Sequence, residues 1–281
     1  MHLCASRSFV LLALTLSPCF SAQVTAAELK PQTRRAFDRY VVLVEQRLQA
    51  TQPPSNAPFL WFQAQPAPQQ GAILQRLKKG EVVTEKLREK DNGREVPVPD
   101  GMLHHWIATV FVPGATLQQT LTLLQDYDHH QDLYKPEVVA SKLLSRDGDR
   151  FRAYMRFYKK KIIGVTLNTE HAAEYVTVDP KRAYSNSHTT KIAEVENAGE
   201  KDEREKPVGH DNGFLWALNS YWRIEEADGG VYVQCEAVSL TRDIPAIVSW
   251  IVKPFVTEVP RESLYNTLNS TRAGLQPRLK K

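Results

Sequence analysis

The spacing of apolar residues changes twice along the chain, and this change constrains the fold most strongly. Apolar residues recur at helical spacing from Pro31 to Ala50, alternate with polar residues through much of Glu81–Thr241, and return to helical spacing in Ile244–Leu275. Alternation is typical of strands with one buried face, whereas steps of three and four residues indicate an amphipathic helix. The order of these patterns predicts an α+β protein in which a sheet packs against a long C-terminal helix.

Polar turn sequences divide the alternating region into strands. The pairs Asp179-Pro180 and Gly229-Gly230 are such turns, because these residues favour backbone angles that strands do not adopt. A Thr-x-x-Gln capping box at Thr116–Gln119 predicts the start of a helix within the region. Pro254 and Pro260 interrupt the C-terminal stripe, so we expect a kinked or two-piece helix there. The predicted strands are Glu81–Leu87, Leu103–Val112, Val138–Leu144, Phe151–Tyr158, Ile162–Val178, Ala183–Val195, Phe214–Glu225 and Gly230–Thr241.

The start of the chain has the composition of a targeting segment. Met1–Ala27 contains no acidic residue and carries an apolar run, Phe9–Leu16, behind Arg7. A helix rises about 1.5 Å per residue, so this run is too short to cross the roughly 30 Å hydrocarbon core of a membrane. Small residues follow the run, as in a cleaved secretory signal peptide, and they allow cleavage after Ala26 or after Ala27. We therefore expect an exported protein, either periplasmic or secreted.

Charge and cysteine content exclude two broad classes of protein. The 36 Lys and Arg residues and 32 Asp and Glu residues are interspersed, so the net charge of +4 gives no segregated basic face of the kind that binds nucleic acid. Removal of the leader would leave Cys235 as the one remaining cysteine. The mature chain is therefore no disulfide-stabilised scaffold, and a chain of this length is stable through its core alone. We expect Cys235 to be a small buried residue.

The segment 28–80 precedes the predicted sheet and differs from it. It contains the predicted helix Pro31–Ala50, a proline-rich stretch Thr51–Gln70 and a short helix Ala72–Lys79 that ends at Gly80. Prolines at this density exclude helix interiors and central strands, which predicts an extended arm. Phe59–Phe62 is too apolar for a free linker, so we expect the arm to pack on the main domain as a brace or as a cover. Residues 81–275 form the predicted domain, and 276–281 form a basic tail.

Several short stretches resemble one protein family. They are Leu124–Asp128, Tyr134–Ser141, the strand that follows Gly148, and the C-terminal helix that follows Arg242–Pro245. Their order and content are similar to the START-like (SRPBCC) superfamily, which includes lipid-transfer and polyketide cyclase/dehydrase-type domains. The resemblance covers residues 81–275 and implies the helix-grip fold, a curved antiparallel sheet wrapped around the C-terminal helix with an internal cavity for a hydrophobic ligand. It specifies a fold and not a chemistry, because its members include binders, transporters and enzymes.

The strand patterns indicate which side chains would face that cavity. Met155 and Phe157 lie on the apolar, predicted inner face of their strand, and His171 and Tyr175 are polar residues on an apolar face of the next. The latter two would hydrogen-bond within the core, orient a ligand, or transfer a proton. Aromatic residues occupy both faces of the strand after Phe214, so its inner face is ambiguous. The candidate ligand-binding residues are His171, Tyr175, Trp216, Asn219, Tyr221, Met155, Phe157 and Glu236, the last of which could pair with Arg242.

No catalytic or metal motif appears in the chain. The patterns of serine hydrolases, nucleotide-binding loops and zinc enzymes are absent. Asp126–His130 has ligand-type side chains, but residues one and two apart do not share a helix face. His104 and His105 would point to opposite sides of one strand. We therefore predict neither a metal nor a cofactor.

These observations favour an exported, non-enzymatic protein that binds a hydrophobic small molecule or lipid. A cyclase/aromatase-like enzyme is the alternative, and it requires His171, Tyr175 and a carboxylate such as Glu236 to meet in one pocket. A second alternative is an envelope structural or interaction module that docks through residues 28–80. Lys159–Lys161 lies at a predicted turn, where it is solvated or makes peripheral contact with anionic lipid. The sequence leaves the oligomeric state and the ligand's identity open.

Overall fold

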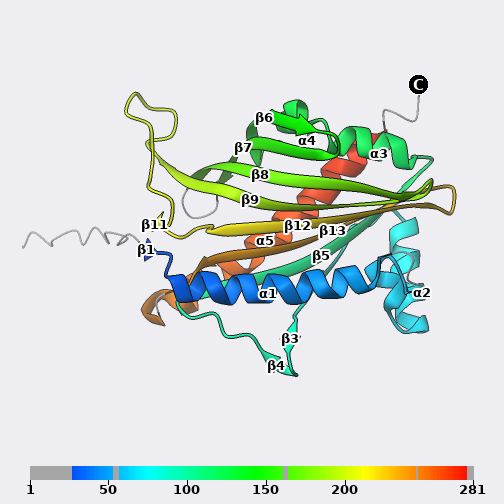
Figure 1. The fold of residues 1–281 in the computed structure, drawn as a ribbon, viewed down its shortest axis with the longest axis horizontal. Helices are drawn as coiled ribbons and strands as arrows, with labels where there is room; N and C mark the ends of the chain where they lie inside the picture. The colour runs from blue at the N-terminus through cyan, green and yellow to red at the C-terminus, as the bar shows by residue number, and fades with distance from the viewer. Residues whose placement is uncertain (1–26, 53–56, 161–163, 245, 277–281) are drawn as a thin grey trace, which may run out of the picture.

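The computed structural model of the protein describes residues 27–52, 57–160, 164–244 and 246–276, with side chains omitted between 246 and 257 (Figure 1). The predicted leader up to Ala26, Lys161, and the tail from residue 277 lie outside these residues. In the described part, no helix combines the length and hydrophobicity that a membrane crossing requires.

One antiparallel sheet organises the molecule. Nine strands form it within the described residues, in the order β2-β5-β13-β12-β9-β8-β7-β6, with β10 attached to β9. Neighbouring strands are antiparallel throughout this path. The strands are β2 (Val83–Lys86), β5 (Gly101–Pro113), β6 (Val138–Asp147), β7 (Arg150–Lys160), β8 (Gly164–Asp179), β9 (Arg182–Glu196), β10 (Arg204–Glu205), β12 (Ala217–Ala227) and β13 (Gly230–Arg242).

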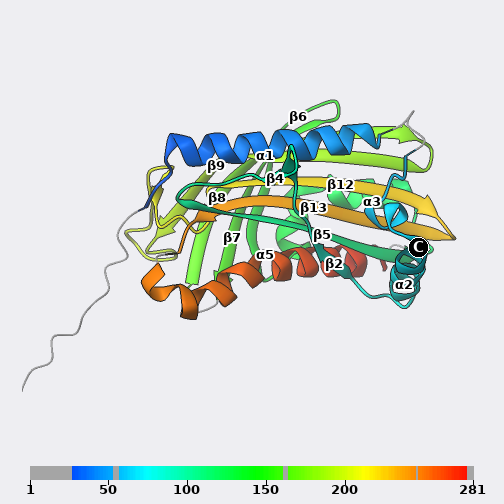
Figure 2. The same ribbon diagram turned by 90° about the horizontal axis from the view of Figure 1, so that it is seen from below.

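Helices cover both faces of this sheet. Helix α5 (Ala246–Leu275) lies along one face, which we call the inner face, and α1 (Pro31–Ala50) lies along the opposite, outer face. Figure 2 shows the sheet between these two helices, and it shows the axis of α5 bending along its length. The assignment of α5 is continuous through Pro254 and Pro260. This arrangement of a curved antiparallel sheet and a long C-terminal helix is the α+β, helix-grip fold predicted from the sequence.

Strand β13 contributes side chains to the cores on both faces of the sheet. Val231 and Val233 pack in the inner core with Leu268 of α5, whereas Val238 and Leu240 pack in the outer core with α1. Side chains of a strand alternate between its faces, so a strand buried on both sides reads as almost continuously apolar. The strand is therefore fixed by packing from two directions.

Helix α1 has the predicted bounds, and its apolar stripe explains its position. Phe37, Tyr40, Val44 and Leu48 follow one another at three- and four-residue steps, and each is at most 5% exposed. Pro31 stands in the first turn, where its missing N–H costs no hydrogen bond. The stripe faces β12 and β13, so α1 lies along the sheet instead of away from it.

The proline-rich arm continues from α1 over the outer face. Leu60 and Phe62 are buried there, as expected for an arm that packs on the domain. Phe62 belongs to the short 3-10 helix η1 (Trp61–Ala64), and Leu60 directly precedes it. Helix α2 (Ala67–Lys78) follows. We predicted that this second helix begins at Ala72, which was wrong. It begins five residues earlier because prolines are accepted in a first helical turn, and Pro68 occupies that place.

A buried arginine ties this arm to the sheet. Arg223 of β12 is 5% exposed, and its guanidinium donates to the carbonyl oxygens of Leu48 (2.6 Å) and Phe59 (2.5 Å). Leu48 lies in the last turn of α1, and its carbonyl also accepts from the Thr51 N–H (3.2 Å) and the Thr51 hydroxyl (2.9 Å). The Arg223 side chain thus joins the end of α1 and the start of the arm to the sheet.

Short elements complete the chain around the sheet. The capping box predicted at Thr116 is present at the start of α3 (Leu117–Leu124). At the sheet edge, the backbone N–H groups of Ser141 and Leu143 in β6 donate to the side chains of Gln131 (2.8 Å) and Asp128 (2.9 Å). The remaining elements are β1 (Ala27–Glu28), β3 (Lys90–Asp91), β4 (Arg94–Glu95), η2 (Tyr127–His129), α4 (His130–Leu133) and β11 (His210–Asp211).

Candidate functional site

The inner face of the sheet is closely packed at one end. Phe151 and Ala153 of β7 and Ile224 of β12 are at most 3% exposed. They share one core cluster with Leu264 and Leu268 of α5. This end of the inner face is filled by side chains and leaves no surface for a ligand.

Further along the same face, the side chains are only half-buried. This open zone, as we call it, includes Trp106, Met155, Trp222 and Ala237, which pack against the inner core but remain partly exposed. Phe157, Leu218 and Ser220 on the same face are also half-buried. The strand register makes the zone contiguous, since Ala237 pairs with both Trp106 and Ser220.

The two faces of β12 differ in exposure, and the outer face is more deeply buried than the face toward α5. Asn219 and Tyr221 point to the outer face and are 9% and 2% exposed, whereas Leu218, Ser220 and Trp222 point toward α5 and are half-buried. The outer face of β12 is therefore covered by α1, and its inner side is less completely covered. Two large aromatic rings and a methionine lie on that side, a composition that suits a hydrophobic ligand.

His171 lies at the boundary between the packed end and the open zone. It is 7% exposed, and its ring meets the Phe157 ring edge-on with centroids 6.0 Å apart. Burial, followed by the positive potential of His130 and His188, lowers the pKa of His171 to about 4, so the ring is neutral at pH 7. The Thr169 hydroxyl donates to the Met155 carbonyl, so it accepts from His171 Nε2 at 2.9 Å. Nδ1 of His171 is consequently a hydrogen-bond acceptor.

Tyr175 belongs to a closed hydrogen-bonded cluster in the packed end. Its hydroxyl donates to the Leu124 carbonyl (3.0 Å) and accepts from Tyr127 (3.0 Å). Burial raises the pKa of Tyr127 to about 12 and holds that of Tyr175 well above its usual value, so both remain protonated. Of the roles predicted for Tyr175, the structure shows hydrogen bonding within the core.

His130 is a member of this interior that the sequence patterns did not indicate. It is 4% exposed and lies between the rings of Tyr127 and Tyr134, at centroid distances of 4.8 and 5.1 Å. Burial lowers its pKa to about 4. Its neighbour His129 is exposed and pairs with Asp126 at 2.7 Å. In the described residues, no group of three or more His, Cys, Asp and Glu side chains is placed to hold a metal ion.

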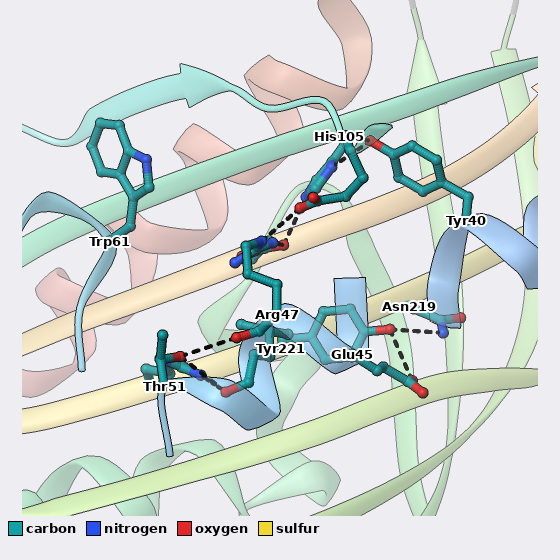
Figure 3. A network of polar contacts seen from close by, with 12 residues as sticks. Tyr40, Glu45, Arg47, Thr51, Trp61, His105, Asn219 and Tyr221 are labelled. Atoms are coloured by element: carbon teal, nitrogen blue, oxygen red, sulfur yellow. Dashed lines mark hydrogen bonds and ion pairs between the residues drawn. The ribbon is translucent and has the colours of Figure 1, made fainter. Parts of the chain in front are cut away.

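The other candidate residues lie on the outer face, under α1 (Figure 3). Trp216 packs in the outer core, and its indole donates to Asp211 Oδ1 at 3.0 Å. Asn219 donates to the Tyr221 hydroxyl (3.2 Å), which donates to Glu45 of α1 (3.1 Å). Met155, Phe157, His171 and Tyr175 thus face α5, whereas Trp216, Asn219, Tyr221 and Glu236 do not. These two sets cannot share one pocket.

Glu236 is the centre of a buried network that fastens α1 to the sheet. Its Oε1 bonds with His105 Nε2 (2.7 Å) and with the Arg47 guanidinium, and His105 Nδ1 bonds with the Tyr40 hydroxyl (2.8 Å). Burial raises the pKa of Glu236, but its two basic partners outweigh that effect and lower it overall. The partner expected from the sequence was Arg242, and this was wrong. Neighbouring residues of a strand point to opposite faces, so His105 lies beside Glu236 on the outer face and His104 lies on the inner face. There, His104 is hydrogen-bonded to Thr241.

This geometry weighs against the enzymatic alternative. Glu236 is separated by the sheet from His171 and Tyr175, so the three groups do not meet in one pocket. Trp106, Trp222 and Ala237 of the open zone were not among the sequence candidates. The alternation of Trp106 with Ala108 and Val110 was the signal that could have identified the first of them.

Two hollows open elsewhere on the described surface. One, of about 380 Å³, lies at the ends of β8 and β9 and is lined in part by Glu194, Arg204 and Lys206. The other, of about 630 Å³, lies between the turns Asp179–Arg182 and Glu225–Asp228. Both are bordered by charged side chains. At the predicted lysine-rich turn, Lys159 Nζ is bonded to Glu137 at 2.6 Å, which occupies its ammonium group.

Comparison with known proteins yields similarity in three-dimensional structure alone. No protein-family model and no curated protein sequence matches the chain. A protein from Thermus thermophilus superposes with a TM-score of 0.45 and 13% identity, covering 61% of this chain and 97% of its own. A STAR-related lipid transfer protein from Xanthomonas axonopodis gives 0.42 and 15%, with 69% and 98% covered. The ZhuI aromatase/cyclase of a Streptomyces species gives 0.42 and 13%, with 63% and 96% covered.

Proposed function

We propose that this chain is an exported protein that binds one hydrophobic small molecule or lipid between the inner face of its sheet and α5. The open zone carries this proposal, because it leaves Trp106, Met155 and Trp222 half-buried on the face that a C-terminal helix should seal. Soluble proteins rarely leave contiguous apolar surface uncovered without a partner. Covering it contributes about 25 cal/mol per Å² of apolar surface, enough for micromolar affinity from a few hundred Å².

The polar groups at the zone suit a ligand with a neutral polar end. His171 is uncharged at pH 7, and its Nδ1 is an acceptor. Ser220 offers a hydroxyl on the same face. A ligand hydroxyl would find an acceptor at His171 without a buried charge, which is costly to leave unpaired. A sterol, a long-chain alcohol or a polycyclic phenol has this chemistry.

Export is supported by the composition of the leader. The run Phe9–Leu16 and the small residues after it are features of a cleaved signal peptide. Cleavage after Ala26 or after Ala27 would remove at most one described residue, so the mature chain would keep the sheet, both long helices and the open zone.

The test compares two tryptophans on opposite faces of the sheet. The full chain is produced in an exporting bacterial host, its native mass is recorded for retained ligand, and its Kd for the fluorescent probe N-phenyl-1-naphthylamine is measured. In Trp222→Ala the probe should lose about 60 Å² of ring contact, which at about 25 cal/mol per Å² is roughly a tenfold weaker Kd. Trp61→Ala removes an equally half-buried ring on the outer face and should leave the Kd unchanged.

Two results would contradict the proposal. One is a protein that carries no ligand and does not bind the probe. The other is equal loss of binding in both variants, which would place the probe outside the open zone. Circular dichroism of each variant establishes that the sheet is intact before the affinities are compared.

A further inference from the structure

Asp211 of β11 carries a buried carboxylate oxygen that lacks a partner. The residue is 1% exposed, and its Oδ1 accepts hydrogen bonds from the Gly213 N–H (2.7 Å) and the Trp216 indole (3.0 Å). Its Oδ2 is buried as well, but no hydrogen-bond donor of the described residues reaches it. A buried carboxylate oxygen without a donor is costly, which indicates that a donor is missing from this place.

Glu194 is a second buried acid in this region, and it adds to the negative charge there. Glu194 of β9 is 3% exposed and accepts from the N–H groups of Asn212 (2.9 Å) and Phe214 (3.1 Å). Burial raises the pKa of Glu194, and the negative charge of Asp211 raises it further. The Lys206 ammonium is 3.8 Å from Glu194 and is shared with Glu196 at 3.4 Å. Glu196 is also paired with Arg204 at 2.7 Å, so among the described residues Lys206 is the one cation that pairs with Glu194.

Ala27 lies directly beside Asp211. Strand β1 pairs with β11, with Ala27 opposite Asp211 and Glu28 opposite His210. The Leu29 N–H donates to the Gly209 carbonyl at 2.8 Å. Hydrogen-bonded pairs alternate along an antiparallel ladder, so the next such pair is Ala27 with Asp211. The backbone nitrogen of Ala27 therefore points toward the backbone carbonyl of Asp211, whereas that of Glu28 points away from β11.

We propose that leader cleavage occurs between Ala26 and Ala27, and that the new α-ammonium group of Ala27 is the missing partner of Asp211 Oδ2. The inference rests on the proposed export of the chain. Hydrolysis breaks the Ala26–Ala27 peptide bond, adds the hydroxyl of water to the Ala26 carbonyl carbon and leaves an amine on Ala27. That amine takes up a proton at neutral pH, because an α-amino group has a pKa of about 7.7–8.0. One of its N–H groups keeps the ladder bond, and the others are free for the carboxylate.

The same geometry distinguishes the two cleavage bonds that the sequence left open. Cleavage after Ala27 would place the ammonium on Glu28, whose nitrogen is not part of a hydrogen-bonded pair with β11. It would also remove the alanine side chain that packs against the outer core. Cleavage after Ala26 instead places the new ammonium group, on Ala27, next to the buried acids Asp211 and Glu194.

The experiment uses the full precursor in an exporting host, with a glycine inserted between Ala26 and Ala27 as the comparison. Amino-terminal sequencing and intact mass of the exported wild type should show a chain that begins at Ala27. The inserted glycine moves the ammonium one residue away from Asp211, and we expect the midpoint of thermal unfolding to fall by about 2–4 °C. In Asp211→Asn, which has no charge to pair, the same insertion should change the midpoint by less than about 1 °C.

Each other outcome has a distinct meaning. An uncleaved chain retained in the cell would overturn the export proposal and this inference with it. An exported chain that begins at Glu28 would leave export and ligand binding intact but overturn the cleavage assignment. A chain that begins at Ala27 but is indifferent to the glycine would show that water, and not the ammonium, satisfies Asp211. If Asp211→Asn does not fold, the wild-type pair with and without the glycine still decides between these results.

Discussion

Replacing Arg223 with methionine should loosen the N-terminal arm while the sheet stays folded. The guanidinium of Arg223 is the donor for the carbonyls of Leu48 and Phe59, and methionine has a similar length and no donor. The substitution therefore removes the bonds between the sheet and the arm without opening a large cavity. The last turn of α1 and the residues Phe59–Phe62 should open more often than the core of the domain.

The size of the effect follows from two opposing contributions. Hydrogen bonds from a charged donor contribute about 1.5–3 kcal/mol each, so two of them amount to roughly 3–6 kcal/mol. Burial lowers the pKa of Arg223 to about 10 from 12.5, and at about 1.4 kcal/mol per pKa step this is a desolvation cost of roughly 3 kcal/mol that methionine does not carry. The difference between these contributions is roughly 0–3 kcal/mol, and the Phe59 carbonyl left without this donor adds to the loss. We therefore expect a net loss of about 1–3 kcal/mol in the free energy of unfolding.

Hydrogen exchange with mass spectrometry measures where this loss appears, and urea unfolding measures its total. Amides of Phe59–Ala64 and of the last turn of α1 should exchange roughly 5- to 150-fold faster in Arg223→Met, which is the range that 1–3 kcal/mol of local stability represents. Amides of β7 and β8 should be unchanged. Arg182→Met is the matched control, because Arg182 also approaches the Phe59 ring (5.8 Å) but pairs with Asp179 at a partly exposed site. Its cost should stay below about 1 kcal/mol.

Unchanged exchange in the arm, or an Arg223→Met variant as stable as the wild type, would refute this reasoning. It would mean that apolar packing of Leu60 and Phe62 holds the arm and that the buried arginine contributes nothing net. Faster exchange throughout the sheet would refute it differently, by showing that arm and sheet unfold as one unit.

Three further substitutions test other parts of the structure. Gly230→Ala should cost at least about 1–3 kcal/mol in urea unfolding, because its Cβ would lie 2.4 Å from the backbone carbonyl oxygen of Val112. Leu268→Ala removes a fully buried side chain of α5 and should cost about 2–5 kcal/mol, measured as a lower thermal midpoint. The pKa of Glu236 is raised by burial but lowered overall by its basic partners, so the stability it contributes is complete above about pH 5 and lost as the pH falls further. Glu236→Gln should therefore show a shallower fall in stability below pH 4.5 than the wild type.

The sheet was predictable where one face of a strand is charged. Arg150, Arg152 and Arg156 alternate with Phe151 and Ala153, so the inner face of β7 followed from the sequence alone. In such a strand, the alternation of charged and apolar residues identifies the face that is exposed to solvent. The α+β class and the order of elements could be derived for the same reason.

The candidate site was less predictable because a distant segment covers the outer face. Both faces of β12 and β13 are apolar, and these strands carry Asn219, Tyr221 and Glu236. The position of α1 decides which of the two faces is the outer one. Local periodicity contains no information on where a helix about 190 residues away in the chain will dock. Glu236 was therefore assigned to a cavity, whereas its position serves to bind Arg47.

The capped edge of β6 bears on how the molecule behaves in a crowded compartment. A long free strand edge invites another chain to add a strand, and repeated addition leads to fibres. Here the amides of Ser141 and Leu143 are already occupied by the side chains of Gln131 and Asp128. An incoming strand would have to displace both acceptors before gaining a bond, so the edge resists polymerisation even though Val139 and Leu144 are exposed along it.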